Sequence, residues 1–427
     1  MNNSVKIGRM LSGELFEFHP TDRRRHFLVI GQTGTGKSVL YQNMIAADLQ
    51  NGSGVALLDP HGDLASAVLA FIPRHRSHQL VYFDPSDVAR PIGYNVLDRV
   101  RADKRPTIAD DIVAAFIHIW GETSVGPRSQ QVLRNSLRAL MDATSTTLLC
   151  IPKLLTDTRY RGHIVRTIQD PFVKTYWTEQ YEAYDKRKRD EVISPLLNKL
   201  DAFLSVPAIR NILAQPKSTI DLRRIMDEGR ILIVRLAKGE LGENNAHLLG
   251  ALIVAGLSHA AFKRSDTQER PLFHLYVDEF QSFATESFAL ILSEARKYGL
   301  TLTLGHQFLS QITSQLRDAV LGNAGSVLAF RIGAEDAPIL ASHLGLKNPD
   351  ALKDLPNFHA WGRFLEHGTP TSPVNIQTYP PPEAVNDNTA ALIQNSRIRF
   401  GRDREAVEER ITRFLTPPET HRRQSRW

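Results

Sequence analysis

The chain has little cysteine and no long apolar segment. Cys150 is the single cysteine in 427 residues, which excludes an internal disulfide and any zinc or iron–sulfur cage of cysteine thiolates. The longest apolar stretch, residues 248–262, is interrupted by a serine and a histidine. It is shorter than the roughly 20 residues of a membrane-spanning helix, so we interpret it as a buried helix. Residues 1–6 lack the apolar core of a signal peptide, and these absences together indicate a cytoplasmic protein.

Neither sign of charge dominates the composition. The chain contains 52 lysines and arginines against 46 aspartates and glutamates, a formal charge of +6. Hydrophobic residues make up 42% of the chain and charged residues 23%, which is ordinary for globular proteins. This composition excludes a wholly disordered, collagen-like or multi-span membrane chain. The length predicts two or three domains.

Short apolar runs alternate with helical patterns in two separate parts of the chain. Near-continuous apolar strands separated by helices are typical of a parallel sheet that is covered on both faces. The predicted fold class is therefore α/β, with a mostly parallel central sheet. We expect buried strands at 26–30, 54–58, 79–83, 231–236, 272–277, 300–304 and 327–332, terminal strands at 361–365 and 374–378, and early helices at 37–50 and 64–71.

The stretch between these two parts has a different pattern. From about residue 101 to 222 apolar residues recur at helical spacing and no strand-like run occurs. We therefore expect an inserted all-helical domain. Its basic run at 186–189 could contact nucleic acid, but the acidic residues around it favour a solvated helix face. The predicted division is 1–100 and 223–382 for the two parts of the sheet domain, 101–222 for the helical domain, and 383–427 for a tail.

The last part of the chain is polar and basic. From Arg397 onward nine arginines stand against five acidic residues. We predict a partly disordered basic tail with one short helix near residues 404–415. Nucleic-acid binding, binding of a partner and simple solubilisation are equally consistent with this composition.

The strongest motif follows the first predicted strand. It is a complete phosphate-binding loop (P-loop) of the pattern G-x-x-x-x-G-K-S, namely Gly31-Gln32-Thr33-Gly34-Thr35-Gly36-Lys37-Ser38. The backbone N–H groups of such a loop, together with the N-terminus of the next helix, bind a polyphosphate. Lys37 can reach the β- and γ-phosphates, and Ser38 offers its hydroxyl to Mg²⁺. The sequence therefore predicts nucleotide binding.

Two short strings imitate the motifs of GTPases. Residues 59–62 fit the switch pattern D-x-x-G, and residues 198–201 fit the guanine-reading pattern N-K-x-D. Only 21 residues separate Lys37 from Asp59, which leaves little room for a magnesium-binding switch loop. The second string follows a helix start rather than the end of a buried strand, where a base-reading motif must lie. Spacing and context thus favour ATP over GTP.

The second catalytic element is predicted at the end of the strand 272–277. An apolar strand that ends in two acidic residues, here Asp278 and Glu279, is the Walker B arrangement. Asp278 would hold Mg²⁺ through its water shell. Glu279 would act as general base toward the attacking water, or at least orient it.

Polar side chains also follow the strand 300–304. Gln307 is placed to sense the γ-phosphate from a strand between the P-loop strand and the acidic strand, and a plain strand-terminating loop is the alternative. For His306 a packing or hydrogen-bonding role is as consistent as a catalytic one.

Taken together, these motifs resemble those of the type IV secretion coupling proteins, the conjugative DNA-pumping ATPases of the HerA/FtsK superfamily. The resemblance implies a RecA-like P-loop ATPase fold with an inserted all-helical domain. It also implies a homo-hexamer with ATP bound between neighbouring subunits and with DNA in the central channel. The stretches that carry the resemblance are HFLVIGQTGTGKS at 26–38, ALLDPHGDL at 56–64, PIGYNVL at 91–97, LYVDEFQSF at 275–283 and EARKYGLTLTLGHQ at 294–307.

The resemblance also implies particular residues and partners. Arg296 matches the arginine finger that such proteins insert into the neighbour's site, Arg331 is the alternative finger, and either could instead form a surface ion pair. Contacts to DNA would be chiefly to phosphates and independent of sequence. The turn at 238–240 is a candidate pore loop. A relaxase or secretion-channel proteins are the implied partners.

The N-terminus departs from the pattern of this family. Typical coupling proteins begin with transmembrane helices, whereas the ATPase motifs here start close to residue 1. We therefore expect any attachment to the inner membrane to be peripheral and to depend on a partner. Two alternatives stay open: a soluble HerA-like DNA-processing ATPase, and an ATP-dependent scaffold that recruits a relaxase or an effector.

Overall fold

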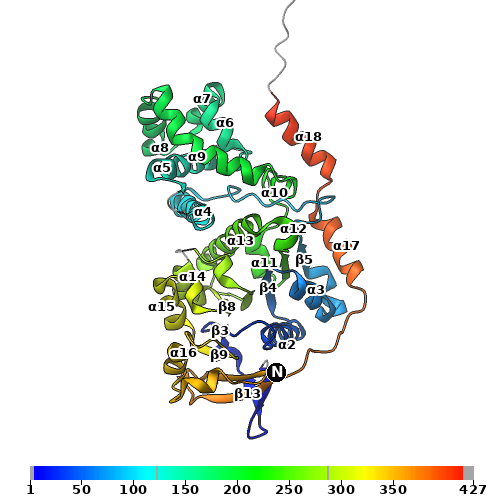
Figure 1. Ribbon diagram of the computed structural model, residues 1–427. Helices are drawn as coiled ribbons and strands as arrows, with labels where there is room; N and C mark the ends of the chain where they lie inside the picture. Colours follow the sequence, from blue (N-terminus) through cyan, green and yellow to red (C-terminus); the bar gives the residue numbers. More distant parts are fainter. Residues whose placement is uncertain (1–3, 122–123, 286–287, 417–427) are drawn as a thin grey trace, which may run out of the picture.

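The computed structural model describes residues 4–121, 124–285 and 288–416 (Figure 1). The strands of its main sheet are β1 (Val5–Met10), β2 (Leu15–Phe18), β3 (Phe27–Ile30), β4 (Gly54–Asp59), β5 (Leu80–Phe83), β6 (Ile231–Arg235), β7 (Phe273–Val277), β8 (Leu300–His306), β9 (Ser326–Ala329), β10 (His359–Arg363) and β13 (Val374–Thr378). Their order in the sheet is β2-β1-β13-β10-β9-β3-β8-β7-β4-β6-β5. The strands from β9 to β5 pair in parallel, and those from β2 to β10 extend the sheet in antiparallel pairing. A separate small hairpin consists of β11 (Leu365–Glu366) and β12 (Thr369–Pro370).

The parallel strands are apolar throughout because both faces of the sheet are covered. Every residue of β3 and β4 is buried. In β3, Phe27 and Val29 belong to one hydrophobic core, whereas Leu28 and Ile30 belong to a second core, as the alternation of side chains along a strand requires. The predicted α/β class with a mostly parallel sheet is confirmed.

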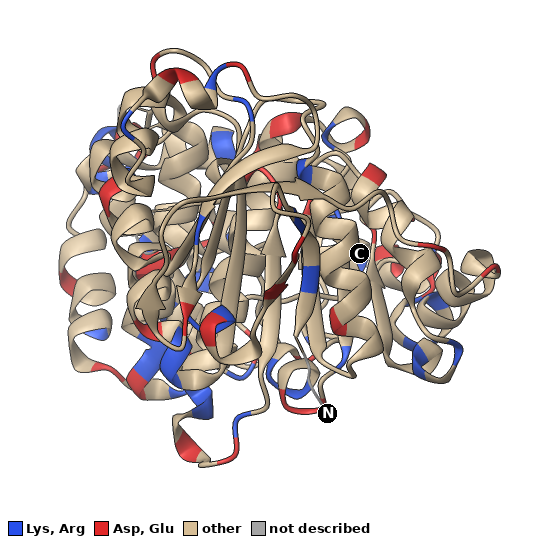
Figure 2. Ribbon diagram, turned by 90° about the horizontal axis from the view of Figure 1, so that it is seen from below, with Lys and Arg blue, Asp and Glu red and all other residues tan. Residues whose placement is uncertain are grey.

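Helices lie on both sides of the sheet, as the view from below shows (Figure 2). Leu40 and Met44 of the helix that follows the P-loop pack into the core that holds Phe27, and Leu248 and Leu252 of a long helix pack into the other core. The helices are α1 (Pro20–Arg23), α2 (Lys37–Gln50), α3 (Asp63–Val68), α4 (Arg105–Trp120), α5 (Pro127–Asp142), α6 (Cys150–Thr156), α7 (Thr158–Thr167), α8 (Pro171–Thr175), α9 (Lys186–Leu204), α10 (Pro207–Leu213), α11 (Leu222–Asp227), α12 (Lys238–Leu241), α13 (Glu243–Lys263), α14 (Phe288–Glu294), α15 (Ser314–Asn323), α16 (Ala337–Leu344), α17 (Thr389–Phe400) and α18 (Arg404–Leu415).

The long helix α13 is the apolar stretch that the sequence assigns to the interior. By length and composition the described stretch Glu243–Asp266 could cross a membrane, but 67% of its most apolar window is buried inside the structure. At Gly250 an added Cβ would lie 2.3 Å from the ring of Phe283, so this helix packs very closely on the chain after β7. Such burial is that of a core helix.

The segment between β5 and β6 forms the helices α4 to α11, of which α4 to α10 lie above the sheet in Figure 1. The basic run of this segment opens α9, where Asp185 caps the helix by accepting a hydrogen bond from the N–H of Lys188. The ammonium of Lys188 lies 4.8 Å from the centre of the Tyr184 ring. These local contacts agree with a solvated helix face.

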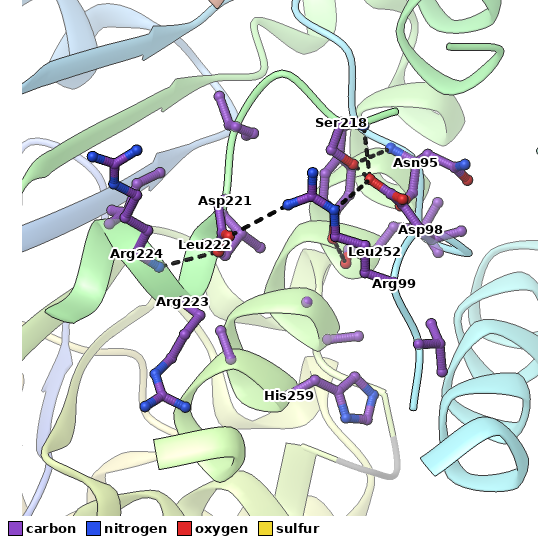
Figure 3. Close-up of a pocket in the computed structure, with 18 of the residues that line it drawn as sticks. Asn95, Asp98, Arg99, Ser218, Asp221, Leu222, Arg223, Arg224, Leu252 and His259 are labelled. Carbon is purple, nitrogen blue, oxygen red and sulfur yellow. Dashed lines mark hydrogen bonds and ion pairs between the residues drawn. The ribbon is translucent and has the colours of Figure 1, made fainter. Parts of the chain in front are cut away.

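Two connecting segments, 91–98 and 214–221, join the helical segment to the sheet and run side by side (Figure 3). Asn95 holds them together, because its Nδ2 donates to the carbonyls of Thr146 (2.8 Å) and Pro216 (2.9 Å) while its Oδ1 accepts the N–H of Leu97. A cavity of about 370 Å³ lies beside them against α4, α11 and α13. It is lined by residues of both parts of the chain and contains none of the predicted site residues.

Replacing Asn95 with alanine is expected to loosen this junction. The side chain is 5% exposed, so the variant leaves two carbonyls and one N–H without partners in a buried place, at a cost of about 1–3 kcal/mol. Urea unfolding followed by circular dichroism measures the loss. Asn395→Ala, an exposed position on α17, is the matched control and should stay within about 0.5 kcal/mol of the natural chain. Equal stability of the two variants would contradict the role assigned to Asn95.

The C-terminal segment differs from the sequence-based expectation. The helix predicted near 404–415 is α18, but α17 was not predicted and packs along the edge strand β5 (Figure 1). There the hydroxyl of Ser396 accepts the N–H of Tyr82 at 2.8 Å, and the Arg397 guanidinium pairs with Asp87. Only Leu392 and Ser396 of α17 are buried, which is too little apolar surface to produce a helical pattern in the sequence. Residues 417–427 of the predicted tail lie outside the described residues.

Candidate active site

The P-loop connects β3 with α2 and is bound to the strands on either side. The N–H of Gly31 donates to the carbonyl of His306 at the end of β8, and the N–H of Gln32 donates to the carbonyl of Arg331 after β9. Gly34 and Gly36 have φ values of 77° and 123°, which residues other than glycine rarely adopt. No side chain caps the N-terminus of α2. Its free N–H groups therefore face the place where phosphates bind.

Lys37 lies inside this loop. Its ammonium donates to the carbonyls of Gly31 and Gln32, the second at 3.0 Å. Burial lowers the pKa of Lys37 from its ordinary value, although Asp278 and Glu279 attract the charged form. The lysine is thus partly desolvated and bound only to neutral acceptors, so an incoming phosphate oxygen offers it a stronger partner.

The carboxyl end of β7 carries the acidic pair next to the P-loop. Burial raises the pKa of Asp278 to about 6, and the carboxylates of Asp59 and Glu279 add to the shift. The buried Asp278 carboxylate fits a divalent cation, since the charge of the cation would relieve the repulsion from Asp59 and Glu279. Among the described residues no group of three His, Cys, Asp or Glu side chains could hold a metal ion by itself. Ser38 and Asp278 would therefore share Mg²⁺ with phosphate and water oxygens, as is usual for this ion.

Glu279 has a strained backbone and three side-chain contacts. Its φ is 47°, an uncommon value for a residue other than glycine and one that is often found at functional sites. Its carboxylate lies 3.0 Å from Nε2 of His61 and 3.5 Å from Nζ of Lys238, and it accepts a hydrogen bond from the amide of Gln307. Burial alone would raise the pKa of Glu279, but the hydrogen bond and charge of His61, with those of Lys238, outweigh it and lower the pKa. The carboxylate is thus kept ionised, as a general base must be.

Gln307 connects the two motifs. Its Oε1 accepts the hydroxyl of Thr33 in the P-loop at 3.2 Å, and its Nε2 donates to Glu279. The strand β8 that precedes it lies between β3 and β7, as the sequence predicts. A side chain that bridges the P-loop and the acidic strand is well placed to respond to a γ-phosphate.

His306 has a structural environment. Its ring is fully buried against Phe280, and Nδ1 lies 2.8 Å from the side-chain oxygen of Gln281. Burial lowers its pKa to about 4, with a further contribution from the charge of Lys37. The imidazole is therefore neutral near pH 7 and packs between the strand ends.

Sequence reasoning missed two of the residues that contact Glu279. His61 follows β4, and Lys238 follows β6 at the start of α12. The sequence offers the turn at 238–240 as a candidate pore loop, whereas the structure places the Lys238 ammonium against Glu279. The sequence contains a signal that could have identified both residues. Each comes just after a predicted parallel strand, and the carboxyl ends of parallel strands meet at one edge of the sheet.

The two GTPase-like strings lie in different surroundings. The Asp59 carboxylate accepts the backbone N–H groups of His61 (2.9 Å) and Ala65 (2.8 Å), so it fixes the turn into α3. The string at 198–201 lies within α9 and at no strand end. The placement of the second string agrees with the sequence-based preference for ATP.

Arg296 lies far from the P-loop of its own chain. It belongs to the 3-10 turn Ala295–Tyr298, which precedes β8. Because β3 and β8 are parallel, this turn and the P-loop lie at opposite edges of the sheet, and the seven residues of β8 span about 23 Å at 3.3 Å each. Arg296 is exposed and, with Arg24, Arg270 and Lys297, lines a basic cavity of about 270 Å³.

Arg331, the alternative finger, lies at the P-loop edge of the sheet. It follows β9, and its guanidinium donates to the carbonyl of Leu355 (3.2 Å) and to Oδ1 of Asn357 (3.1 Å). The structure therefore places the two candidate arginines at opposite edges, with Arg331 beside the P-loop of its own chain.

Comparison with known proteins agrees with this architecture. The sequence matches the family model described as the central domain of the helicase HerA over residues 5–254, and a search of curated proteins gives no match. The plasmid coupling protein TrwB in complex with the ATP analogue ADPNP is similar with a TM-score of 0.63 at 16% identity, over 90% of this chain and 91% of that chain. TrwB in complex with ADP and Mg²⁺ gives 0.59 at 16% identity over the same shares. VirB4 of Thermoanaerobacter pseudethanolicus gives 0.60 at 14% identity, over 88% and 96%. The likeness confirms the RecA-like P-loop ATPase fold.

Proposed function

The chain belongs to the family of the HerA helicase central domain, and on this premise we propose that it is a ring-forming ATPase that moves DNA, as conjugative coupling proteins do. It is an ATPase of the conjugation and secretion type, with ATP and Mg²⁺ as its ligands. One observation carries the proposal: the P-loop, the acidic pair and Gln307 converge at one edge of the sheet.

In the proposed reaction each residue at this edge has a definite task. The P-loop N–H groups bind the phosphates, and Lys37 exchanges the carbonyls of its own loop for the γ-phosphate. Ser38 and Asp278 would hold Mg²⁺, which would withdraw charge from the phosphates. Glu279 accepts a proton from the attacking water, and its contact with Gln307 couples its position to the presence of the γ-phosphate.

The position of Arg296 supports catalysis between subunits. An exposed basic cavity at the edge opposite the P-loop cannot serve the site of its own chain, but in a ring it can face the P-loop edge of the next subunit. We therefore assign Arg296, rather than Arg331, as the finger of a homo-hexamer. The guanidinium of Arg331 is already bound to its own chain beside the P-loop.

Arg296→Ala is expected to lower ATP turnover by about 10³- to 10⁵-fold, the range measured for arginine fingers. Mixing it with Glu279→Gln subunits should restore part of the activity, because a site with Glu279 from one subunit and Arg296 from the other is complete. A steady-state phosphate-release assay of each variant and of the mixture measures this. Arg166→Ala, an exposed arginine on α7, is the control. If the mixture gains no activity over its parts, the finger does not act between subunits.

A DNA-dependent ATPase assay, with size analysis in the presence and absence of ATP, tests the function as a whole. Strong stimulation by DNA of any sequence, weakening as salt rises, together with a ring of six subunits, is the expected result. Hydrolysis that DNA leaves unchanged would favour the ATP-dependent scaffold. A relaxase or secretion-channel partner, and a peripheral place at the inner membrane through such a partner, belong to the same proposal.

A further inference from the structure

The positions of the site residues determine in which direction a bound nucleotide extends from the P-loop. The γ-phosphate end must lie toward Glu279 and Gln307, which follow β7 and β8 on one side of the P-loop strand. The triphosphate is linear, so its other end points away from these residues. The nucleoside is therefore expected on the other side of β3, where β9, β10 and β13 lie.

An exposed aromatic side chain lies at that place. Phe358, just before β10, is 40% exposed and has a φ of 66°, a strained value for a bulky residue. Its N–H donates to the carbonyl of Thr35 in the P-loop at 2.8 Å, and its own carbonyl accepts the N–H of Thr378 at 2.8 Å. The ring lies against the loop, since a Cβ added to Gly36 would come within 3.0 Å of Phe358 Cδ1.

A second loop completes the surroundings of this ring. The residues after β13 are tied to α2, because Nδ2 of Asn43 donates to the carbonyls of Tyr379 (3.4 Å) and Pro380 (2.9 Å). The backbone before β10 and the backbone after β13 are thus both bound to the P-loop or its helix. These contacts fix the position of the backbone at Phe358, next to the phosphate site.

We propose that the Phe358 ring is the surface on which the nucleobase of ATP stacks, an inference that rests on the proposed ATPase function. Stacking on an aromatic ring needs no hydrogen-bond reader and accepts any base, because every base has a π-face. Backbone strain of this kind is often found at ligand sites. The ring therefore supplies affinity for the nucleoside, while the P-loop supplies affinity for the phosphates.

Comparison of ATP with inorganic tripolyphosphate, which has no base, separates the two contributions. In the full chain, Phe358→Ala is expected to weaken ATP binding about 5- to 150-fold, the range that alanine substitution gives for base stacking, and to leave tripolyphosphate binding unchanged. GTP binding should weaken by the same factor as ATP binding. Phe358→Tyr, which keeps the ring, should restore ATP binding. Phe172→Ala, which removes a phenylalanine that is 84% exposed on α8, should change none of these values.

Isothermal titration calorimetry gives the dissociation constants, and a thermal melt checks that each variant is folded. If Phe358→Ala does not fold, Phe358→Leu keeps the apolar bulk without the π-face and carries the same comparison. Unchanged ATP affinity, or an equal loss for ATP and tripolyphosphate, would overturn the inference, because the ring would then only support the P-loop. ATP binding without stimulation of hydrolysis by DNA would remove the motor function and leave the stacking role intact.

Discussion

Lys37→Ala is expected to lower ATP turnover by this chain about 10²- to 10³-fold. The ammonium lies inside the P-loop and is partly desolvated there. Its loss removes a charge-assisted contact at the point where negative charge develops, and losses of this kind cost about 10²- to 10³-fold in turnover. ATP binding should weaken as well, since the β- and γ-phosphates lose a partner. Phosphate release and calorimetric titration with ATP measure the two effects.

The control for this substitution is Lys347→Ala, at an exposed position after α16. It removes the same charge far from the P-loop and should keep full activity. Lys37 also binds the carbonyls of Gly31 and Gln32, so a thermal melt must show that the variant retains its fold. A folded Lys37→Ala protein with normal turnover would refute the assignment of the P-loop as the site of hydrolysis.

Glu279→Gln is expected to separate binding from chemistry. Glutamine has the same shape and can still form hydrogen bonds with His61 and Gln307, so ATP should bind with nearly unchanged affinity. The amide cannot accept a proton from water, and loss of a general base costs about 10²- to 10⁴-fold in turnover. A single-turnover experiment with labelled ATP should find the nucleotide bound but not cleaved.

Glu366→Gln, at an exposed position in the β11–β12 hairpin, is the matched control and should hydrolyse ATP normally. Normal turnover by Glu279→Gln would remove the base assignment and leave the contacts of this residue with His61 and Lys238 as structural. Loss of ATP binding in the same variant would instead indicate that the carboxylate mainly organises the phosphate site.

Much of the fold is readable from local sequence patterns. The helix expected at 37–50 is α2 with the same bounds, and the strand expected at 374–378 is β13, because apolar periodicity and strong flanking signals mark both. The N-terminal hairpin of β1 and β2 was not predicted. β1 has only a partly alternating burial pattern and is stabilised by pairing with β13, at the other end of the chain. Pairing of this kind leaves no trace in the local sequence.

Some residues of the candidate site can likewise be predicted from the sequence, and others cannot. The P-loop and the pair Asp278 and Glu279 can be found from the sequence, since each motif is contiguous and attached to a recognisable strand. The contacts of Glu279 with His61 and Lys238 could not be found in this way, because they join the ends of strands far apart in the sequence. No sequence motif marks Phe358.

The sequence by itself determined that this chain binds the phosphates of a nucleotide beside an acid-tipped strand, because the chemistry needs those residue types at short, fixed spacing. Only the tertiary structure decided which side chains surround the carboxylate of Glu279, and that Arg296 faces away from its own P-loop. The reason is physical: neighbours across a parallel sheet depend on strand order, and strand order arises from packing and chain connection rather than from any local run of residues.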